Sequence, residues 1–145
     1  DSSRLQTGRL PMEKKSVVAV SVFLKNSKNQ FLFLRRSKNN STGVGCFQLP
    51  EGKIEWDEKP EETIKREVRE ETSGKVSNLR LEGVSSVTLK AKGNEYHVLR
   101  IIYSGKFSGK IKLSEYHTDF QWMTLKEALK QPLLNGVEGA IRQVL

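Results

Sequence analysis

One stretch decides how this chain is interpreted, and it reads Leu49-Pro50-Glu51-Gly52-Lys53-Ile54-Glu55-Trp56-Asp57-Glu58, continuing further on as Arg66-Glu67-Val68-Arg69-Glu70-Glu71. Its second half follows Pro60, a residue that suits the first turn of a helix. The pattern predicts a helix over 60–72, with Ile64 and Val68 as a narrow apolar stripe one turn apart. Gly74 is expected to end this helix in a left-handed conformation.

Three carboxylates of the predicted helix, Glu67, Glu70 and Glu71, are spaced at i, i+3 and i+4. At about 3.6 residues per turn they fall on one face, beside the apolar stripe. Like charges this close repel each other, and a hard cation such as Mg²⁺, Mn²⁺ or Ca²⁺ would relieve the repulsion. A solvated acidic face balanced by nearby basic residues would explain the same three residues. For the helix by itself the solvated face is the preferred explanation, and the rest of the stretch changes this preference.

The whole stretch resembles the Nudix box of the MutT-like hydrolases. That signature is a glycine, five residues, Glu, seven residues, and then Arg-Glu-aliphatic-x-Glu-Glu-x-Gly. The positions that match in type and spacing are Gly52, Glu58, Arg66, Glu67, Val68, Glu70 and Glu71. A looser resemblance extends to the strand pair expected within 17–36 and to the stretch 120–125. The resemblance implies an α/β (α+β) fold of the Nudix type, an α/β/α sandwich with a central mixed β-sheet.

The chain departs from the family pattern at two positions. The closing glycine of the box would fall at position 73, where this chain has Ser73, and Gly74 is expected to supply the helix cap one residue later. Because that glycine does no chemistry, Ser73→Gly is expected to change activity little. Glu51 stands where relatives often carry glycine. The family uses the backbone carbonyl at this place as a metal ligand, so Glu51 remains an expected ligand and adds a negative charge beside the metal.

The resemblance also implies roles for the box residues and a Mg²⁺ cofactor, with Mn²⁺ as a substitute. Glu67 and Glu71 would bind the metal directly, and Glu70 directly or through water. Glu67 is the first choice for the general base on the attacking water. Arg66 would orient Glu67 through a charge-assisted hydrogen bond. Glu58 would either hold a metal-bound water or pair with Arg66.

Several residues outside this core of the box are further candidates. Glu115, and with lower preference Asp119, would complete the metal site or act as base, because relatives carry an acidic residue near this place. Arg36 is expected to contact a phosphate or base, against an even alternative of a strand-end surface charge. Among the aromatic residues, Trp56 is the first candidate to stack on a base, against a preferred alternative of packing at the core or rim. His117 is expected to be an ordinary surface histidine.

The rest of the chain is predicted to alternate hairpins and helices. Strands are expected over 18–24, 30–35, 47–50, 84–91, 96–103 and 119–123. Thr124 and Glu127 form a capping box for a short helix, Pro132 stops it, and a last helix is expected over about 135–145. This order favours one mixed sheet covered by helices.

Composition limits the class of protein. With 145 residues, 36% of them hydrophobic and 29% charged, the chain is expected to form one domain over 16–145, preceded by a flexible arm or expression remnant over 1–15. No segment is long and apolar enough for a membrane span. The single cysteine, Cys46, fits a reducing cytoplasmic location. The net charge of +8 favours anionic ligands, yet scattered basic residues do not favour nucleic acid as the main partner.

The expected function is hydrolysis of a phosphoanhydride bond in a nucleoside diphosphate linked to another moiety. A nucleoside-triphosphate pyrophosphohydrolase of MutT type is preferred, because the chain is short and lacks an added recognition domain. Dinucleoside polyphosphates, ADP-ribose and capped RNA are the alternative substrates. A nucleotide-binding regulator on a Nudix fold and a basic RNA-associated protein are the alternatives from other classes. The oligomeric state is open.

Overall fold

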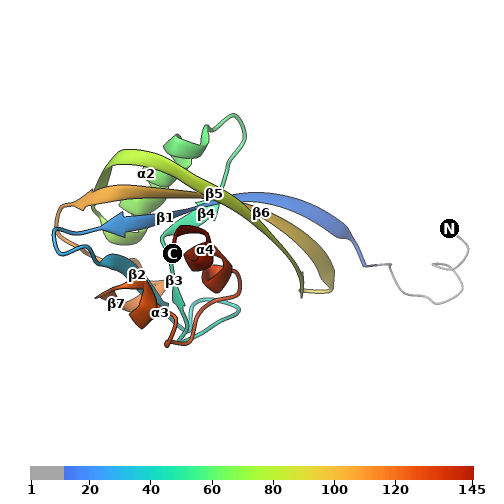
Figure 1. Ribbon diagram of the computed structural model, residues 1–145. Coiled ribbons are helices and arrows are strands. Elements are labelled where there is room, and N and C mark those ends of the chain that lie inside the picture. The colour runs from blue at the N-terminus through green and yellow to red at the C-terminus, as the bar shows by residue number, and fades with distance from the viewer. Residues whose placement is uncertain (1–11) are drawn as a thin grey trace, which may run out of the picture.

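The computed structural model describes residues 12–145, and Figure 1 shows strands with helices packed on both sides. In chain order the elements are β1 (Lys14–Lys25), β2 (Phe31–Arg36), β3 (Phe47–Gln48), β4 (Glu51–Lys53), α2 (Pro60–Thr72), β5 (Lys75–Ala91), β6 (Asn94–Ser108), β7 (His117–Met123), α3 (Leu125–Ala128) and α4 (Val137–Val144). The helices of the described chain are all too short or too polar to span a membrane. Most of the proposed arm, residues 1–11, lies outside the described residues, and Lys14 and Lys15 already belong to β1.

The strands form one mixed sheet in the order β3-β2-β1-β6-β5, with β4 paired to β1 and β7 paired to β2. β1 and β6 run parallel along the whole of β1, from Lys14 opposite Glu95 to Lys25 opposite Lys106. The predicted hairpin of β1 and β2 is present, with Lys25 opposite Phe31. A parallel pair needs a long crossover between its strands, and here that crossover carries β2, β3, β4, α2 and β5. The topology therefore places the box helix next to the centre of the sheet.

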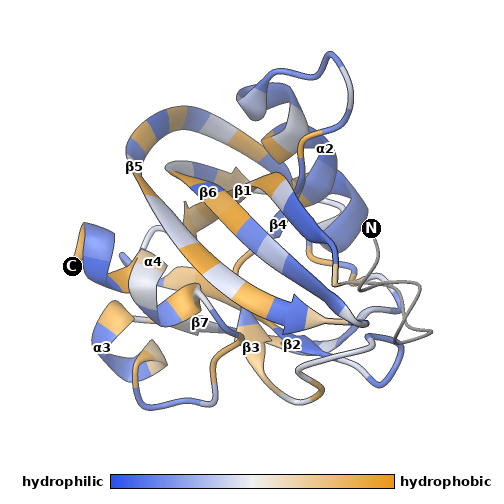
Figure 2. Ribbon diagram, turned by 90° about the vertical axis from the view of Figure 1, so that its right-hand side faces the viewer, coloured by the Kyte–Doolittle hydropathy of each residue, from blue (hydrophilic) through white to orange (hydrophobic). Residues whose placement is uncertain are grey.

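The sheet lies between α2 on one face and α3 with α4 on the other (Figure 2). Successive residues of a strand point to opposite faces, so Val22 of β1 packs in the core under α2 while Phe23 packs in the core under α4. Ile64 and Val68 fix α2 to its core, and each is 1% exposed or less. The predicted α/β/α sandwich with a central mixed sheet is confirmed.

The predicted helix over 60–72 is confirmed at both ends, whereas several strand and helix bounds differ from the predictions. β5 begins at Lys75 instead of 84, because register shifts against β6 on either side of Leu81 break the alternation that marks a strand. The strand β4, which is part of the box, was not predicted, and it pairs with β1. The last helix begins at Val137 instead of 135, because Gly136 takes a positive φ of 95° at its N-cap.

The end of α2 corrects the expectation that Gly74 supplies the left-handed cap. Ser73 itself is the C-cap, with φ 65° and ψ 5°, and its N–H donates to the carbonyl oxygen of Arg69. Gly74 is needed for a different reason. A Cβ at position 74 would overlap the ring of Phe107 on β6. The glycine thus allows the chain to pass close under β6 as it leaves the helix.

Ser73→Gly is accordingly expected to stabilise the protein while leaving activity unchanged. A left-handed conformation costs a residue with a Cβ about 1–2 kcal/mol, and the greater freedom of glycine in the unfolded chain offsets about 0.4–1 kcal/mol. The free energy of unfolding should rise by about 0.5–1 kcal/mol, measured by urea denaturation. Ser73→Ala is the control, since it keeps the strain and loses only the hydroxyl contact to Lys112. A glycine variant less stable than the parent would refute this account.

Candidate active site

The carboxylates of the box meet at one cavity of about 420 Å³, which we call the carboxylate cavity. Glu67, Glu70 and Glu71 reach it from α2, because they sit beside the buried stripe of that helix as predicted. β4 supplies Glu51, and β2, β3, β7 and two loops supply the remaining wall. Its lining residues are Arg36, Asn40, Gln48, Glu51, Glu67, Glu70, Glu71, Ser114, Tyr116 and His117.

Arg66 ties the two halves of the box together. Its Nε and Nη2 donate to the two carboxylate oxygens of Glu58 at 2.8 and 3.0 Å. Its Nη1 donates to Glu67 Oε1 at 2.6 Å and to Glu70 Oε2 at 3.4 Å. Glu58 also accepts a hydrogen bond from the Thr63 hydroxyl at 2.6 Å. This bond fixes the carboxylate that holds Arg66. Of the two expectations for Glu58, the structure places it as the partner of Arg66.

These contacts separate the pKa values of the carboxylates. The hydrogen bonds from Arg66 and Thr63 lower the pKa of Glu58 to about 2. Burial raises the pKa of Glu67, although the hydrogen bond from Arg66 opposes the shift. Burial, and then the neighbouring charges of Glu67 and Glu51, raise the pKa of Glu71 well above its usual value. Glu58 is therefore a fixed anion, whereas Glu67 and Glu71 are carboxylates whose charge is costly until a cation offsets it.

Gly52 and Glu51 show how closely the box strand approaches the helix. A Cβ at position 52 would overlap the carboxyl group of Glu67, so only glycine leaves room for that side chain. The backbone N–H of Glu51 donates to Glu71 Oε2 at 3.1 Å. The motif glycine is thus a packing requirement of Glu67.

Arg100 of β6 is a site residue that the sequence interpretation missed. Its Nη2 donates to Glu51 Oε2 at 2.9 Å, and the two side chains are only 9% and 14% exposed. The charge added by Glu51 at this family position is therefore compensated by an arginine 49 residues away in the chain. One signal was available, because Arg100 occupies an inward position of β6, two residues before the fully buried Ile102.

Of the other candidates from the sequence, some line the carboxylate cavity and some lie outside it. Arg36 lines it, and its Nε donates to the carbonyl oxygen of Thr42 at 3.0 Å. Glu115 is exposed, and it contacts Ser37 and Asn39 through its backbone carbonyl oxygen, which accepts from both side chains. Asp119 pairs instead with Arg35 at 3.0 Å, outside the cavity lining. Trp56 is 98% exposed and is likewise absent from that lining.

His117 corrects a second expectation, since it is buried and not an ordinary surface histidine. It is 7% exposed and lines the carboxylate cavity. Burial, assisted by the charge of Arg36, lowers its pKa to about 4. The pattern of β7 gave no signal for this, because burial does not alternate between His117 and Met123 and a register shift against β2 lies at His117.

The donor set of the carboxylate cavity fits a hard divalent cation. The acidic side chains of the cavity offer carboxylate oxygens, which are the atoms that such a cation prefers. One of these oxygens, Oε1 of Glu51, is buried without a hydrogen-bond partner. Within residues 12–145 no three acidic, histidine or cysteine side chains already converge on a common point. Glu67 is turned to Arg66, Glu51 to Arg100, and Glu71 to a backbone N–H. Rotation of the Glu67 and Glu71 side chains is the change that binding would require, since Glu51 is expected to bind through its backbone carbonyl.

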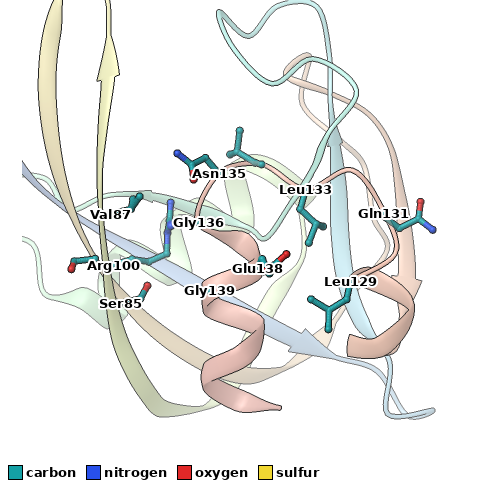
Figure 3. Close-up of a pocket in the computed structure, with 12 residues that line it drawn as sticks. Ser85, Val87, Arg100, Leu129, Gln131, Leu133, Asn135, Gly136, Glu138 and Gly139 are labelled. Atoms are coloured by element: carbon teal, nitrogen blue, oxygen red, sulfur yellow. The ribbon is translucent and has the colours of Figure 1, made fainter.

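Two further cavities adjoin this site through the Arg100–Glu51 pair. Glu51 and Arg100 both line a cavity of about 350 Å³ beside Tyr96 and Lys92. Arg100 also lines a cavity of about 510 Å³ between β5–β6 and the α3–α4 connection, which we call the α4 cavity. Figure 3 shows Ser85, Val87 and Arg100 on one side of it and the α4 residues opposite. The three cavities offer room for a ligand longer than a diphosphate.

The comparisons with known proteins identify the family. The family model of the NUDIX domain matches residues 15–144. A MutT-like protein of Streptomyces ambofaciens is 30% identical over 138 residues, covering 90% of this chain and 80% of that protein. The crystal structure of the MutT protein from Methanosarcina mazei is 29% identical, with a TM-score of 0.75, and the match covers 91% of this chain and 94% of that chain.

A second solved structure, the MutT NUDIX hydrolase from Burkholderia pseudomallei, is 27% identical with a TM-score of 0.77. That match covers 90% of this chain and 98% of the other. Hydrolases of this family generally use divalent metal ions. With the family model, the MutT-like relative and both structures in agreement, the chain belongs to the Nudix family and is a Nudix hydrolase.

Proposed function

We propose that this enzyme hydrolyses a phosphoanhydride bond in a nucleoside diphosphate linked to another moiety, with Mg²⁺ as its cofactor and Mn²⁺ as a substitute. The observation that carries the proposal is the carboxylate cavity, where Glu67, Glu70 and Glu71 of one helix face the cation Arg36. Carboxylates on one side suit a divalent cation, and a guanidinium on the other suits a phosphate. We prefer a nucleoside triphosphate as substrate and release of pyrophosphate as the reaction.

In this mechanism the residues of the box hold the cation and activate water. Glu67 and Glu71 would bind the cation directly, Glu70 directly or through water, and Glu51 through its backbone carbonyl. A bound divalent cation would neutralise phosphate oxygens and lower the pKa of water. Glu67 accepts the proton as the water oxygen bonds to phosphorus, and the anhydride oxygen leaves with the second phosphate product. Arg66 holds Glu67 in place through the bond at 2.6 Å.

The adjoining cavities support a nucleotide as the substrate. With its phosphates at the carboxylate cavity, a nucleotide would have its nucleoside near the cavity beside Tyr96, which shares Glu51 with the carboxylate cavity and Arg100 with the α4 cavity. The α4 cavity combines apolar walls, such as Leu133, with polar groups such as Asn135 and Ser85, a mixture typical of small-molecule sites. Trp56 remains a proposed stacking residue, in a loop that follows Gly52.

Dinucleoside polyphosphates, ADP-ribose and capped RNA remain alternative substrates of the same site. Incubation with Mg²⁺ and a panel of these compounds and nucleoside triphosphates, with both products identified by mass spectrometry in ¹⁸O-labelled water, tests the proposal. The label identifies the phosphorus that is attacked. Turnover at background level for every compound of the panel would reject the proposal.

The single cysteine, Cys46, has no partner for a disulfide, and we propose a reducing compartment, the cytoplasm, as the place of action.

Removal of divalent cations is expected to abolish turnover. The acidic groups of the cavity have no cysteine partner and bind through oxygen, so EDTA should reduce the rate to background. Mg²⁺ or Mn²⁺ added in excess of the chelator should restore it, measured by phosphate or pyrophosphate release. The melting temperature should rise on Mg²⁺ addition, because a ligand of the folded state stabilises it. Full turnover in EDTA would contradict the proposed cofactor.

A further inference from the structure

His117 is a buried polar group that the proposed mechanism does not use. It is the first residue of β7 and lies opposite Arg36 of β2, at a register shift between Arg35 and Arg36. Bulges of this kind often lie next to active sites and redirect a side chain. Here the shift brings Arg36 and His117 to the same cavity as the carboxylates of α2.

Neither ring nitrogen of His117 has a hydrogen-bond partner, although both are buried. A buried polar group without a partner carries a free-energy cost, and such a group in a native structure requires an explanation. A neutral imidazole offers one N–H donor and one acceptor. The histidine χ2 torsion is broad, so a modest ring rotation turns a nitrogen toward the cavity.

The surroundings of His117 favour an anion as its partner. The guanidinium of Arg36 acts on the charge of the ring, and it is held by Thr42 and by Gln48, itself 3% exposed. The carboxylates of α2 line the same cavity and are the groups that suit a cation. A substrate diphosphate with its bound cation would therefore present its remaining oxygens to Arg36 and His117.

We infer that His117 is a substrate-binding residue that donates its ring N–H to a phosphate oxygen beside Arg36. The inference rests on the proposed function, since it assigns His117 to the same substrate. The bond is present in the bound substrate as well as in the transition state, so it lowers KM more than it raises kcat. A hydrogen bond to a charged phosphate is among the stronger ones in proteins.

Kinetics of three His117 variants test the inference. His117→Leu removes both nitrogens, and kcat/KM should fall by about 10- to 100-fold, mostly through KM. His117→Asn and His117→Gln place an amide near the Nδ1 and Nε2 positions, and one of them should recover most of the loss. The matched control is His97→Leu, because His97 is the other histidine of the chain and is exposed. Unchanged kinetics in His117→Leu would overturn the inference.

The melting temperature of His117→Leu distinguishes a substrate-binding role of His117 from a structural one. Without ligand, His117→Leu should melt at the same temperature as the parent or higher, because it removes two unpaired buried nitrogens. A fall in melting temperature with a proportional loss of kcat at unchanged KM would mean that His117 serves the fold, and would overturn the inference.

Histidine ring resonances in NMR provide a readout that is independent of turnover. With only two histidines in the chain, the signal of His117 is assigned by the His117→Leu spectrum. Methylenediphosphonate, a non-hydrolysable pyrophosphate analogue, is added with Mg²⁺, and a sample with Mg²⁺ alone is the control. The His117 signal should shift further with the analogue than with Mg²⁺ alone, while the His97 signal stays. No such shift would overturn the inference even if nucleotides are hydrolysed, and a shift without hydrolysis would support it while rejecting the proposed function.

Discussion

Glu67→Gln is expected to lower kcat by about 10² to 10⁴ at saturating Mg²⁺. The substitution keeps the length and the acceptor oxygen that faces Arg66, and it removes the basicity and negative charge of the carboxylate. Substrate affinity should suffer less, because Glu70 and Glu71 still face the cavity. The rate of product release by the variant and the parent, each with saturating Mg²⁺, measures the effect.

The same substitution should leave the metal-free protein as stable as the parent or more stable. Burial raises the pKa of Glu67 above its ordinary value of 4.5, so the folded protein holds this proton more tightly than the unfolded chain does. Stability is then fully present below pH 4.5 and is lost as pH rises through the raised pKa, with Glu71 acting in the same direction. Glutamine does not ionise and so avoids this loss of stability. The melting temperature in EDTA, measured from pH 4 to 8, should therefore fall less with rising pH in the variant than in the parent.

Glu61→Gln is the matched control, since Glu61 is exposed in the first turn of the same helix and outside the cavity lining. Its activity should be normal. If Glu67→Gln melts much earlier than the parent yet turns over normally, Glu67 is structural and the base has to be sought elsewhere, with Glu115 as the first candidate from the sequence.

The second large effect is expected from Arg100→Leu. The pair of Arg100 and Glu51 is almost completely buried, and the substitution leaves Glu51 beside Glu67 and Glu71 without the arginine that pairs with it. Breaking a buried pair by removing one partner costs about 3–5 kcal/mol, a large part of the roughly 5–15 kcal/mol that stabilises a domain. Urea denaturation without metal should record a fall in the free energy of unfolding of that size.

A double-mutant cycle identifies the cause. Glu51→Gln combined with Arg100→Leu removes both charges, and most of the lost stability should return. Mg²⁺ should rescue the single variant more than the parent, since a cation would offset the uncompensated carboxylate. A single variant that loses less than about 1 kcal/mol, a typical value for an exposed pair, would show that the arginine does not neutralise Glu51.

The box helix was predictable because its information is local. Pro60 at the start, the Ile64 and Val68 stripe and the spacing of the carboxylates lie within one helix, and helical periodicity alone places them on one face. Its last residue was also predicted, but the reason was wrong. Ser73 itself takes the left-handed conformation, and Gly74 is required where the chain passes Phe107, a contact with a residue more than 30 positions later in the chain.

The amino-acid sequence by itself therefore determined the family, the acidic face of α2 and the donor chemistry of the site, because residues a few positions apart fix their own geometry. Only the tertiary structure decided which distant residues complete the site. Strand register sets those partners: the parallel pairing of β1 with β6 brings Arg100 to Glu51, and the pairing of β2 with β7 brings His117 to Arg36. A shift of one residue in either register would turn these side chains to the opposite face of the sheet, and no pattern within a single strand specifies that register.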